Sequence, residues 1–201
     1  MAAKPHIYMP VDIKTLKPLP EEYKIKPKEE PVQWFAMRAI YRYEIFIKEK
    51  LEADNFKCFV PLEIKERVIH GRKTRTWAPV INNLIFVQAK KSELHKWKQT
   101  EPRLQYLMKR AEGGRYTQIV IPDDQMTSFI RIYENGNHEV RAMETDFKPG
   151  MAVRVISGPF QGMTGRFQKV KGHRERRFVI TLDNVAFIST TDVGIGMIEK
   201  I

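Results

Sequence analysis

The chain has 201 residues, of which 42% are hydrophobic and 29% are charged. This length suits one large or two small packed domains, and the composition excludes disorder of the whole chain. The 35 Lys and Arg outnumber the 24 Asp and Glu, and the net charge of +11 favours polyanions as partners. The single cysteine, Cys58, excludes an internal disulfide and a thiolate metal cluster. No apolar run suits a membrane helix or a secretory signal, so a soluble cytoplasmic protein is expected.

Changes in composition divide the chain into three blocks. Residues 1–31 hold six prolines and few large apolar side chains, so a flexible arm is expected there. The middle block, 32–146, and the C-terminal block, 147–201, each carry a net charge of +5. Both candidate domains are therefore basic.

The middle block begins with an aromatic-rich run, Trp34 to Ala39, that predicts a buried strand. The apolar period then lengthens to that of a helix face, which Asn55 ends. This face comprises Tyr43, Phe46, Ile47 and Leu51. From Phe56 to Ile64 apolar and polar residues alternate, which predicts a strand with one covered face. Cys58 lies on the apolar side and is interpreted as a small core residue, not as a reactive thiol.

A basic segment follows at residues 65–77. It holds five Lys or Arg and one Glu around His70-Gly71, where the glycine can supply the positive φ of a tight turn. The segment is predicted to form a basic β-hairpin. Its long cations could follow phosphates without reading sequence, and the alternative is a charged hairpin that only faces solvent.

The rest of the middle block alternates strands and helices. We expect a strand at Leu84–Val87 and a helix capped by Ser92. Strands near 106–108 and 119–121 precede a helix with Pro122-Asp123 at its start, where Asp123 is the expected cap. The apolar face of this helix comprises Met126, Phe129, Ile130 and Tyr133. The connections are too short for parallel crossovers, so the expected fold class is α+β, with an antiparallel-rich sheet flanked by helices.

In the C-terminal block short strands alternate with glycine turns. Strands are expected at 153–155, 167–170, 177–182 and 185–189, with Gly172 and Asp183-Asn184 at turns. A small closed barrel suits this segment, because closure removes the exposed edges of a small sheet.

The run from Phe147 to Gly165 resembles the KOW motif of the NusG family of transcription elongation factors. It reads Phe-Lys-Pro-Gly-x-x-Val-Arg-Val-x-x-Gly-Pro-Phe-x-Gly-x-x-Gly. Gly158 is expected to need a positive φ, and Gly162 and Gly165 are expected to permit close backbone crossing.

The upstream block resembles the NusG N-terminal (NGN) domain in order and spacing. The matching segments are Trp34-Phe35-Ala36, Tyr43-Glu44, Phe59-Val60-Pro61, the basic hairpin and Leu84–Val87. The resemblance implies an arm at 1–31, an NGN domain at 32–134, a linker at 135–146 and an SH3-like KOW barrel at 147–201. Within the family, Gly71-Arg72-Lys73-Thr74 and the lack of a large insertion are closest to the paralogues RfaH and UpxY. UpxY proteins are antiterminators of surface-polysaccharide operons.

The resemblance implies how such a protein acts. NGN domains dock an apolar depression onto the clamp helices of the largest RNA polymerase subunit, bridge the cleft and suppress pausing and termination. By position Phe35, Leu84 and Phe86 would line this depression, and the alternative is that all three are core residues. His95 is a candidate second polymerase contact, although it alone remains of a His-Thr-Thr-Thr motif. Asn82-Asn83-Leu84 also departs from the Pro-Gly-Tyr of many relatives.

Two further contacts are implied. The non-template DNA strand or the upstream duplex would meet the cations Arg38, Arg42, Arg67, Arg72, Lys73 and Arg75. A KOW barrel recruits a second protein such as ribosomal protein S10 or Rho, and Phe160 and Phe187 are candidates for that surface unless they are buried. No cofactor, metal or membrane partner is expected, and the protein is expected to be a monomer.

Two other classes of protein are considered. An enzyme is disfavoured, because the five histidines are scattered and the sequence has no Gly-rich phosphate loop or Cys-x-x-Cys. A ribosome-associated or general RNA-binding KOW protein would share the basic charge and the barrel. That class predicts binding to naked RNA as tight as binding to an elongation complex.

Overall fold

The fold is that of a computed structural model, which describes residues 29–69, 72–136, 138–142, 150–182 and 185–201. Pro31–Ile201 forms one compact unit, and this unit is described below. Several features predicted above lie outside the described residues: the arm up to residue 28, the His70-Gly71 turn, residues 143–146 of the linker, residues 147–149 of the KOW-like run and the Asp183-Asn184 turn. The division into an NGN domain, a linker and a KOW domain stays a prediction.

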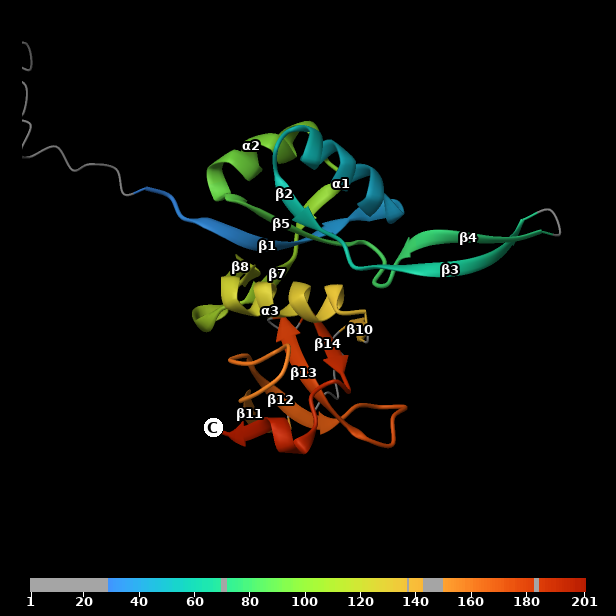
Figure 1. The fold of residues 1–201 in the computed structure, drawn as a ribbon. Helices are drawn as coiled ribbons and strands as arrows, with labels where there is room; N and C mark the ends of the chain where they lie inside the picture. The colour runs from blue at the N-terminus through green and yellow to red at the C-terminus, as the bar shows by residue number, and fades with distance from the viewer. Residues whose placement is uncertain (1–28, 70–71, 137, 143–149, 183–184) are drawn as a thin grey trace, which may run out of the picture. The chain divides into compact units, whose positions relative to one another are not determined.

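Five antiparallel strands form the first sheet (Figure 1). Four of them run in the order β2-β5-β1-β6, and β9 also pairs with β1. The strands are β1 Val32–Ala39, β2 Lys57–Phe59, β5 Leu84–Lys90, β6 Leu104–Tyr106 and β9 Val120–Ile121. Central β1 and β5 pair from Val32↔Lys90 to Arg38↔Leu84. Their apolar runs are continuous because both faces of this sheet are covered.

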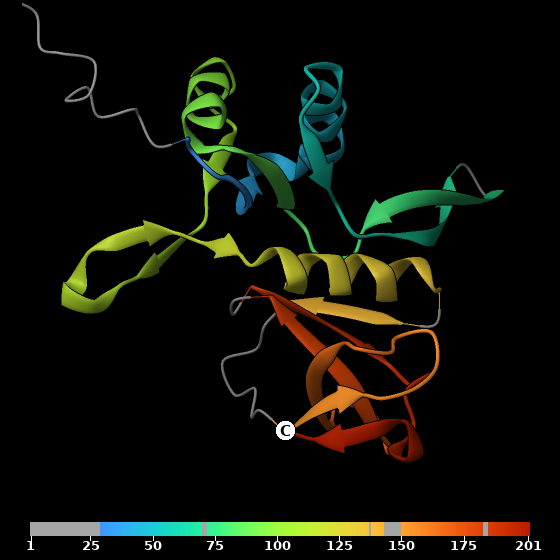
Figure 2. The same cartoon turned by 60° about the vertical axis from the view of Figure 1, so that its left-hand side comes forward.

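Helices cover the two faces of the first sheet (Figures 1 and 2). Helices α1, Glu44–Ala53, and α2, Lys91–Thr100, cover one face, and α3, Asp123–Glu134, covers the other. Phe35 lies in the core cluster on the side of α1 and α2, whereas Trp34 and Phe86 lie in the cluster with α3. This division follows from the two-residue period of a strand.

Two hairpins extend from opposite sides of the first sheet (Figure 2). The first joins β3, Leu62–Ile69, to β4, Arg72–Pro79, and it confirms the predicted hairpin. The second joins β7, Met108–Arg110, to β8, Tyr116–Gln118, through a short turn at Glu112–Gly114. Sequence analysis predicted one strand near 106–108, but the chain divides there into β6 and β7.

The C-terminal sheet has six antiparallel strands in the order β10-β14-β13-β12-β11-β15. Their bounds are β10 Glu139–Ala142, β11 Met151–Val155, β12 Thr164–Lys169, β13 Arg176–Leu182, β14 Ala186–Thr190 and β15 Ile198–Lys200. Strands β10 and β15 were not predicted, and β10 lies in the expected linker. Helix α3 packs on this sheet, and Asn135 Nδ2 donates a hydrogen bond to Asp192 Oδ2 at 2.8 Å. Closure into an SH3-like barrel stays a prediction.

The predicted face of α1 was partly wrong. Ile47 and Leu51 are buried, but Tyr43 and Phe46 are 39% and 44% exposed. The guanidinium of Arg103 lies 4.4 Å from the Tyr43 ring centre and 5.2 Å from that of Phe46. The two rings therefore support a surface cation and are not core residues.

Three other local predictions were wrong. The strand expected at 56–64 is interrupted between β2 and β3, where Pro61 cannot donate a ladder hydrogen bond, and Ile64 beyond it is 57% exposed. Ser92 lies inside the first turn of α2, whose N-cap is Lys90. Asp123 is the first residue of α3 and does not cap it, and its Oδ1 accepts a hydrogen bond from Gln88 Nε2 at 3.1 Å.

Glycine positions in the C-terminal sheet give a first prediction. Gly158 has the expected positive φ of 84°. Gly162 was expected to permit a close backbone crossing, but a Cβ there would meet no neighbour, and its φ of 86° is what favours glycine. A Cβ on Gly165 would lie 2.7 Å from both Phe178 Cε2 and the Val179 carbonyl oxygen. We expect Gly165→Ala to lower the free energy of unfolding by about 2 kcal/mol in urea titration. Gly196→Ala, in open space, is the control, and equal losses for both variants would contradict the close crossing.

Candidate functional site

The predicted cations lie in two places. One is the end of β1 and the turn that leads from it to α1, and the other is the first hairpin. Arg38 is near the end of β1 and Arg42 is in the short turn before α1, while Arg72, Lys73 and Arg75 belong to β4. All five are exposed. The side chain of Arg67 is outside the part of the chain that the structure describes.

One face of the first hairpin combines exposed apolar side chains with charge. Pairing places Ile64 opposite Trp77, Glu66 opposite Arg75 and Val68 opposite Lys73. Ile64, Val68 and Trp77 are 57%, 70% and 62% exposed. Such interleaving of an aromatic residue with cations suits single-stranded nucleic acid, since bases stack on rings while cations hold phosphates.

The cations of β4 are not equivalent. Nε and Nη2 of Arg75 lie 2.9 and 2.8 Å from Glu66 Oε1, so that charge is partly compensated. Among the described residues no carboxylate pairs with Arg72 or Lys73. These two cations are therefore the ones most available to a phosphate.

A hollow of about 470 Å³ lies where the first hairpin meets the start of α1. Trp77, Arg42, Lys65 and Glu44 are among its lining residues, and we call it the Trp77 hollow. It offers an exposed aromatic face beside two cations. Sequence analysis missed Trp77, although a tryptophan inside a basic hairpin is a signal that could have identified it.

A buried carboxylate anchors the backbone around this hollow. Glu44 is 1% exposed, and its Oε1 accepts a hydrogen bond from the backbone N–H of Asn83 at 3.2 Å. Asn83 Oδ1 in turn accepts from the backbone N–H of Arg42 at 2.9 Å. Arg42 and its neighbour Tyr41 both have a φ of 61°, a conformation that costs of order 1 kcal/mol or more for residues with a Cβ. The link from Glu44 through Asn83 holds this turn and the start of β5 together.

A second hollow, of about 290 Å³, lies at the start of β5. Its lining residues are Arg38, Ile81, Asn82, Asn83, Leu84, Leu107 and Val185. We call it the Leu84 hollow. It combines apolar walls with one exposed cation, and Val185 brings a wall from the C-terminal sheet.

The three apolar residues predicted to line one depression do not share a surface. Leu84, 4% exposed, lines the hollow, but Phe35 and Phe86 are almost fully buried. Phe35 also lies in the core cluster on the other face of the sheet. The common lining was therefore wrong for Phe35 and Phe86, because both belong to β1 and β5, which are covered on both faces.

The remaining predicted site residues are scattered. His95 is exposed on α2. This helix covers one face of the first sheet, whereas Leu84 belongs to the core cluster on the other face, with α3. Phe160 and Phe187 are 1% and 2% exposed, so they are core residues and not surface aromatics. Phe187 packs with Val170 and Val179 inside the C-terminal sheet.

Cys58 is not an activated thiol. Burial raises the pKa of the Cys58 thiol to about 11, reinforced by Glu52 and opposed by Lys48, so the thiol stays protonated at neutral pH. In the described ranges no group of three or more His, Cys, Asp or Glu could hold a metal ion. None of the described helices has the length and apolar character needed to cross a bilayer.

A buried ion pair beside α1 predicts a pH dependence of stability. Glu101, 2% exposed, accepts from Arg103 Nε and Nη2 at 2.6 and 2.9 Å and from Lys50 Nζ at 2.9 Å. The bonds from Arg103 lower the pKa of Glu101 from 4.5 to about 2, against the opposing effect of burial. Its stabilisation is complete above the unfolded pKa of about 4.5 and is lost as pH falls towards 2.

We therefore expect Glu101→Gln to lower the free energy of unfolding by about 2 kcal/mol at pH 6. The gap between wild type and variant should close as pH approaches 2, as urea titration across this range would show. Glu93→Gln, which removes an exposed partner of Lys90 at 3.9 Å, is the control and should change stability by less than about 0.5 kcal/mol. A gap that stays constant with pH would contradict this role of Glu101.

Comparison with known proteins places this geometry in context. Residues 32–130 match the model of the family described as "NusG: Transcription termination factor nusG". Residues 32–130 are therefore a NusG-family domain. It holds the first sheet, both hairpins, the Trp77 hollow, every lining residue of the Leu84 hollow except Val185, and most of α3. Its fold is NusG N-terminal-like, a sheet with three helices.

Solved structures were also compared with the chain. A structure described as "Domain interaction in Thermotoga maritima NusG" is 20% identical, covers 85% of this chain and 98% of that one, and has a TM-score of 0.40. A structure described as "Crystal Structure of MjSpt4:Spt5 complex conformation B" is 14% identical, covers 84% and 96%, and has a TM-score of 0.26. No curated protein matches the chain significantly.

Proposed function

We propose that this protein is a transcription elongation and antitermination factor that binds RNA polymerase through its NusG-family domain. The observation that carries the proposal is the NusG-family domain at residues 32–130. In this account the Leu84 hollow receives the clamp helices of the largest polymerase subunit. The domain then bridges the active-site cleft and suppresses pausing and termination.

The first hairpin supports a second role for the same domain. Arg72 and Lys73 present unpaired charge among the described residues, and Trp77 presents an exposed ring further along the same strand, on the face of Lys73. Arg38 and Arg42 lie in the Leu84 and Trp77 hollows, so cations accompany both. In our proposal these groups hold the non-template DNA strand, or the upstream duplex, while Leu84 contacts polymerase.

A pausing assay tests the proposal. Purified RNA polymerase is halted at a defined site on a linear template and released with and without the protein. We expect the lifetime of downstream pauses to shorten several-fold at saturating protein. Unchanged or longer pauses would overturn the assignment as an antitermination factor.

The exposed ring of Trp77 gives a separate prediction. Loss of one base-stacking platform costs about 1–3 kcal/mol, so Trp77→Ala should weaken binding of a single-stranded DNA oligonucleotide roughly 10-fold. Fluorescence anisotropy with labelled oligonucleotide measures this. Tyr116→Ala, which removes a ring 69% exposed on the second hairpin, is the matched control and should change affinity less than about 2-fold. Equal effects would remove Trp77 from the interface.

The finer assignments extend the same proposal. We propose that the protein acts on long surface-polysaccharide operons as UpxY-type factors do, and that residues 147–201 form a KOW domain that recruits a second protein such as ribosomal protein S10 or Rho. These assignments depend on the resemblance in the KOW-like run and the hairpin. Because Phe160 and Phe187 are buried, the partner surface of this domain must use other side chains.

The alternative function is a ribosome-associated or general RNA-binding KOW protein. The exposed cations of the chain would suit that function too. The two functions differ in one measurement, because the alternative requires naked RNA to bind as tightly as an elongation complex does.

A further inference from the structure

The highest density of cations in the chain lies outside the NusG-family domain. Residues 169–177 run from the last residue of β12 through the loop into the start of β13. They hold five Lys or Arg and one Glu, and no other nine-residue window holds more than four Lys or Arg. Lys169, Arg174 and Arg176 are exposed. In the described part of the chain no carboxylate pairs with these three side chains. We call residues 169–177 the basic connection.

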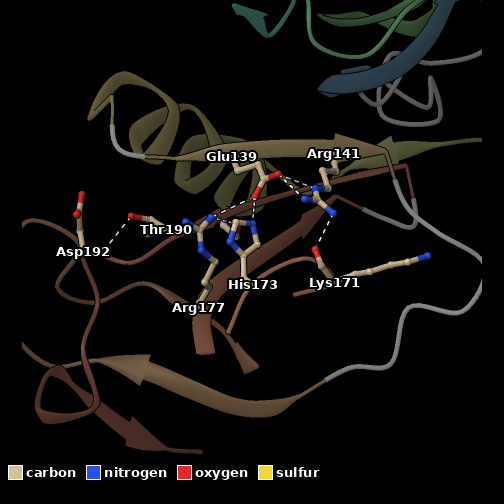
Figure 3. Close-up of polar contacts among 8 residues, drawn as sticks. Glu139, Arg141, Lys171, His173, Arg177, Thr190 and Asp192 are labelled. Carbon is tan, nitrogen blue, oxygen red and sulfur yellow. Dashed lines mark hydrogen bonds and ion pairs between the residues drawn. The ribbon is translucent and has the colours of Figure 1, made fainter. Parts of the chain in front are cut away.

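The basic connection is held in a fixed conformation by one carboxylate, that of Glu139 on β10 (Figure 3). Glu139 Oε2 lies 2.5 Å from His173 Nε2 and 3.2 Å from Arg177 Nη1. Arg141 donates to Glu139 Oε1 through Nε at 2.7 Å and to the Lys171 carbonyl oxygen through Nη1 at 2.9 Å. Strand β10 thus fixes three positions along the connection.

This arrangement divides the basic residues into two sets. His173, Arg177 and Arg141 converge on Glu139. Burial raises the pKa of the Glu139 carboxyl, but the hydrogen bonds from Arg141 and His173 lower it by more, so its pKa lies below the usual value. Lys169, Arg174 and Arg176 have no such partner among the described residues. Glu139 offsets one of the two guanidinium charges and holds the inner set in place, so the outer set presents its charge to solvent on a preorganised support.

The surroundings of the outer set distinguish between partners. Between residues 157 and 194, none of the described residues is an exposed large hydrophobic side chain, and on the neighbouring strand β11 Met151, 39% exposed opposite Phe167, is the single exposed apolar residue. The centre of a protein–protein interface is usually apolar and poor in charge, so this surface does not suit a protein partner. A phosphodiester backbone needs only positioned cations, and Arg binds phosphate oxygens bidentately.

We propose that the basic connection is a second nucleic-acid site of this protein, which binds the phosphate backbone of a single strand through Lys169, Arg174 and Arg176. It has no aromatic platform, so binding is independent of base sequence and strongly dependent on salt. RNA and DNA share the recognised group, and the test below distinguishes them. The site lies outside the proposed polymerase interface and acts without it.

The experiment uses the full chain with Arg72→Gln, Lys73→Gln and Arg75→Gln, so that the first hairpin contributes less. The affinity for a 20-nucleotide oligouridylate, and separately for oligodeoxythymidylate, is measured from about 50 to 200 mM salt, the range over which phosphate contacts are lost. Adding Lys169→Gln, Arg174→Gln and Arg176→Gln should reduce the slope of log affinity against log salt by about 2, at about 0.7 for each phosphate contact. Affinity at 100 mM salt should fall roughly 30-fold.

The control removes the same charge from α2 through Lys91→Gln, Lys96→Gln and Lys98→Gln, with circular dichroism to check that both variants are folded. It should leave the slope unchanged. If the slope falls with only one of the two probes, the site binds that nucleic acid, RNA or DNA. If it falls with both, the site binds the phosphate backbone that RNA and DNA share. Equal effects of the two triple variants, or an equally tight complex with a 20-residue polyglutamate, would overturn the proposal. Because polymerase is absent, failure of the proposed function would not alter this result.

Discussion

Leu84→Ala is expected to weaken binding of the protein to core RNA polymerase about 30-fold. Leu84 lines the hollow of about 290 Å³ at the start of β5, and truncation of its side chain removes part of the apolar wall against which a partner's side chain would pack. Central apolar contacts of this kind cost about 2 kcal/mol or more when they are truncated. Biolayer interferometry with immobilised core polymerase measures the loss.

Leu84 also packs in the core cluster with α3, so its variant needs a control for folding. Arg38→Glu alters the rim of the same hollow at an exposed position and should weaken binding about 10-fold without loss of thermal stability. Ile180→Val, in the C-terminal sheet, lowers stability without touching the hollow and should leave polymerase affinity unchanged. If Ile180→Val lowers affinity as much as the two hollow variants do, Leu84 acts through the fold and not through contact.

The triple variant Arg72→Gln, Lys73→Gln and Arg75→Gln is expected to reduce the salt dependence of binding to an assembled elongation complex. Each phosphate contact to a single strand contributes about 0.7 to the slope of log affinity against log salt, so loss of the two uncompensated cations should lower the slope by about 1.4 and loss of all three by less than about 2. Arg75 is already bonded to Glu66 at 2.8 Å, so most of the effect should come from Arg72 and Lys73. Titration of the complex across a range of salt concentrations gives the slope.

A double variant separates these contributions. Arg72→Gln with Lys73→Gln should reproduce nearly all of the slope change, while Arg75→Gln alone should change it by less than about 0.5. The matched control is Lys91→Gln, Lys96→Gln and Lys98→Gln on α2, which removes as much charge elsewhere. An unchanged slope in the triple variant would remove the first hairpin from the interface.

Much of the fold could be predicted because periodicity and turn residues report local structure directly. The apolar runs at 34–39 and 84–87 form the central strands, and Pro122-Asp123 begins α3. The exposed rings of Tyr43 and Phe46 could not be predicted, because their cover is Arg103, which lies some 60 residues away in the sequence. Strand β10 was missed for a similar reason, since its pairing with β14 depends on tertiary contact.

The candidate site was less predictable than the fold. The basic hairpin followed from charge and a turn glycine, but which of its cations are compensated depends on cross-strand pairing such as Glu66↔Arg75. Burial reversed the assignment of Phe160 and Phe187, because the sequence pattern does not show that the turn at Phe160 folds onto the core or that β14, with Phe187, is buried along its whole length. Glu44 gave a visible signal as an acidic residue in an apolar helix face, yet its role as an anchor required the position of Asn83.

The most direct test of the central claim compares the affinity of the full chain for an assembled elongation complex, for core RNA polymerase and for naked RNA under the same salt. We expect binding to polymerase with or without nucleic acid, tightest for the elongation complex, and at least about 10-fold tighter there than to naked RNA. A protein that binds naked RNA as tightly as the elongation complex, and core polymerase not at all, would contradict the account.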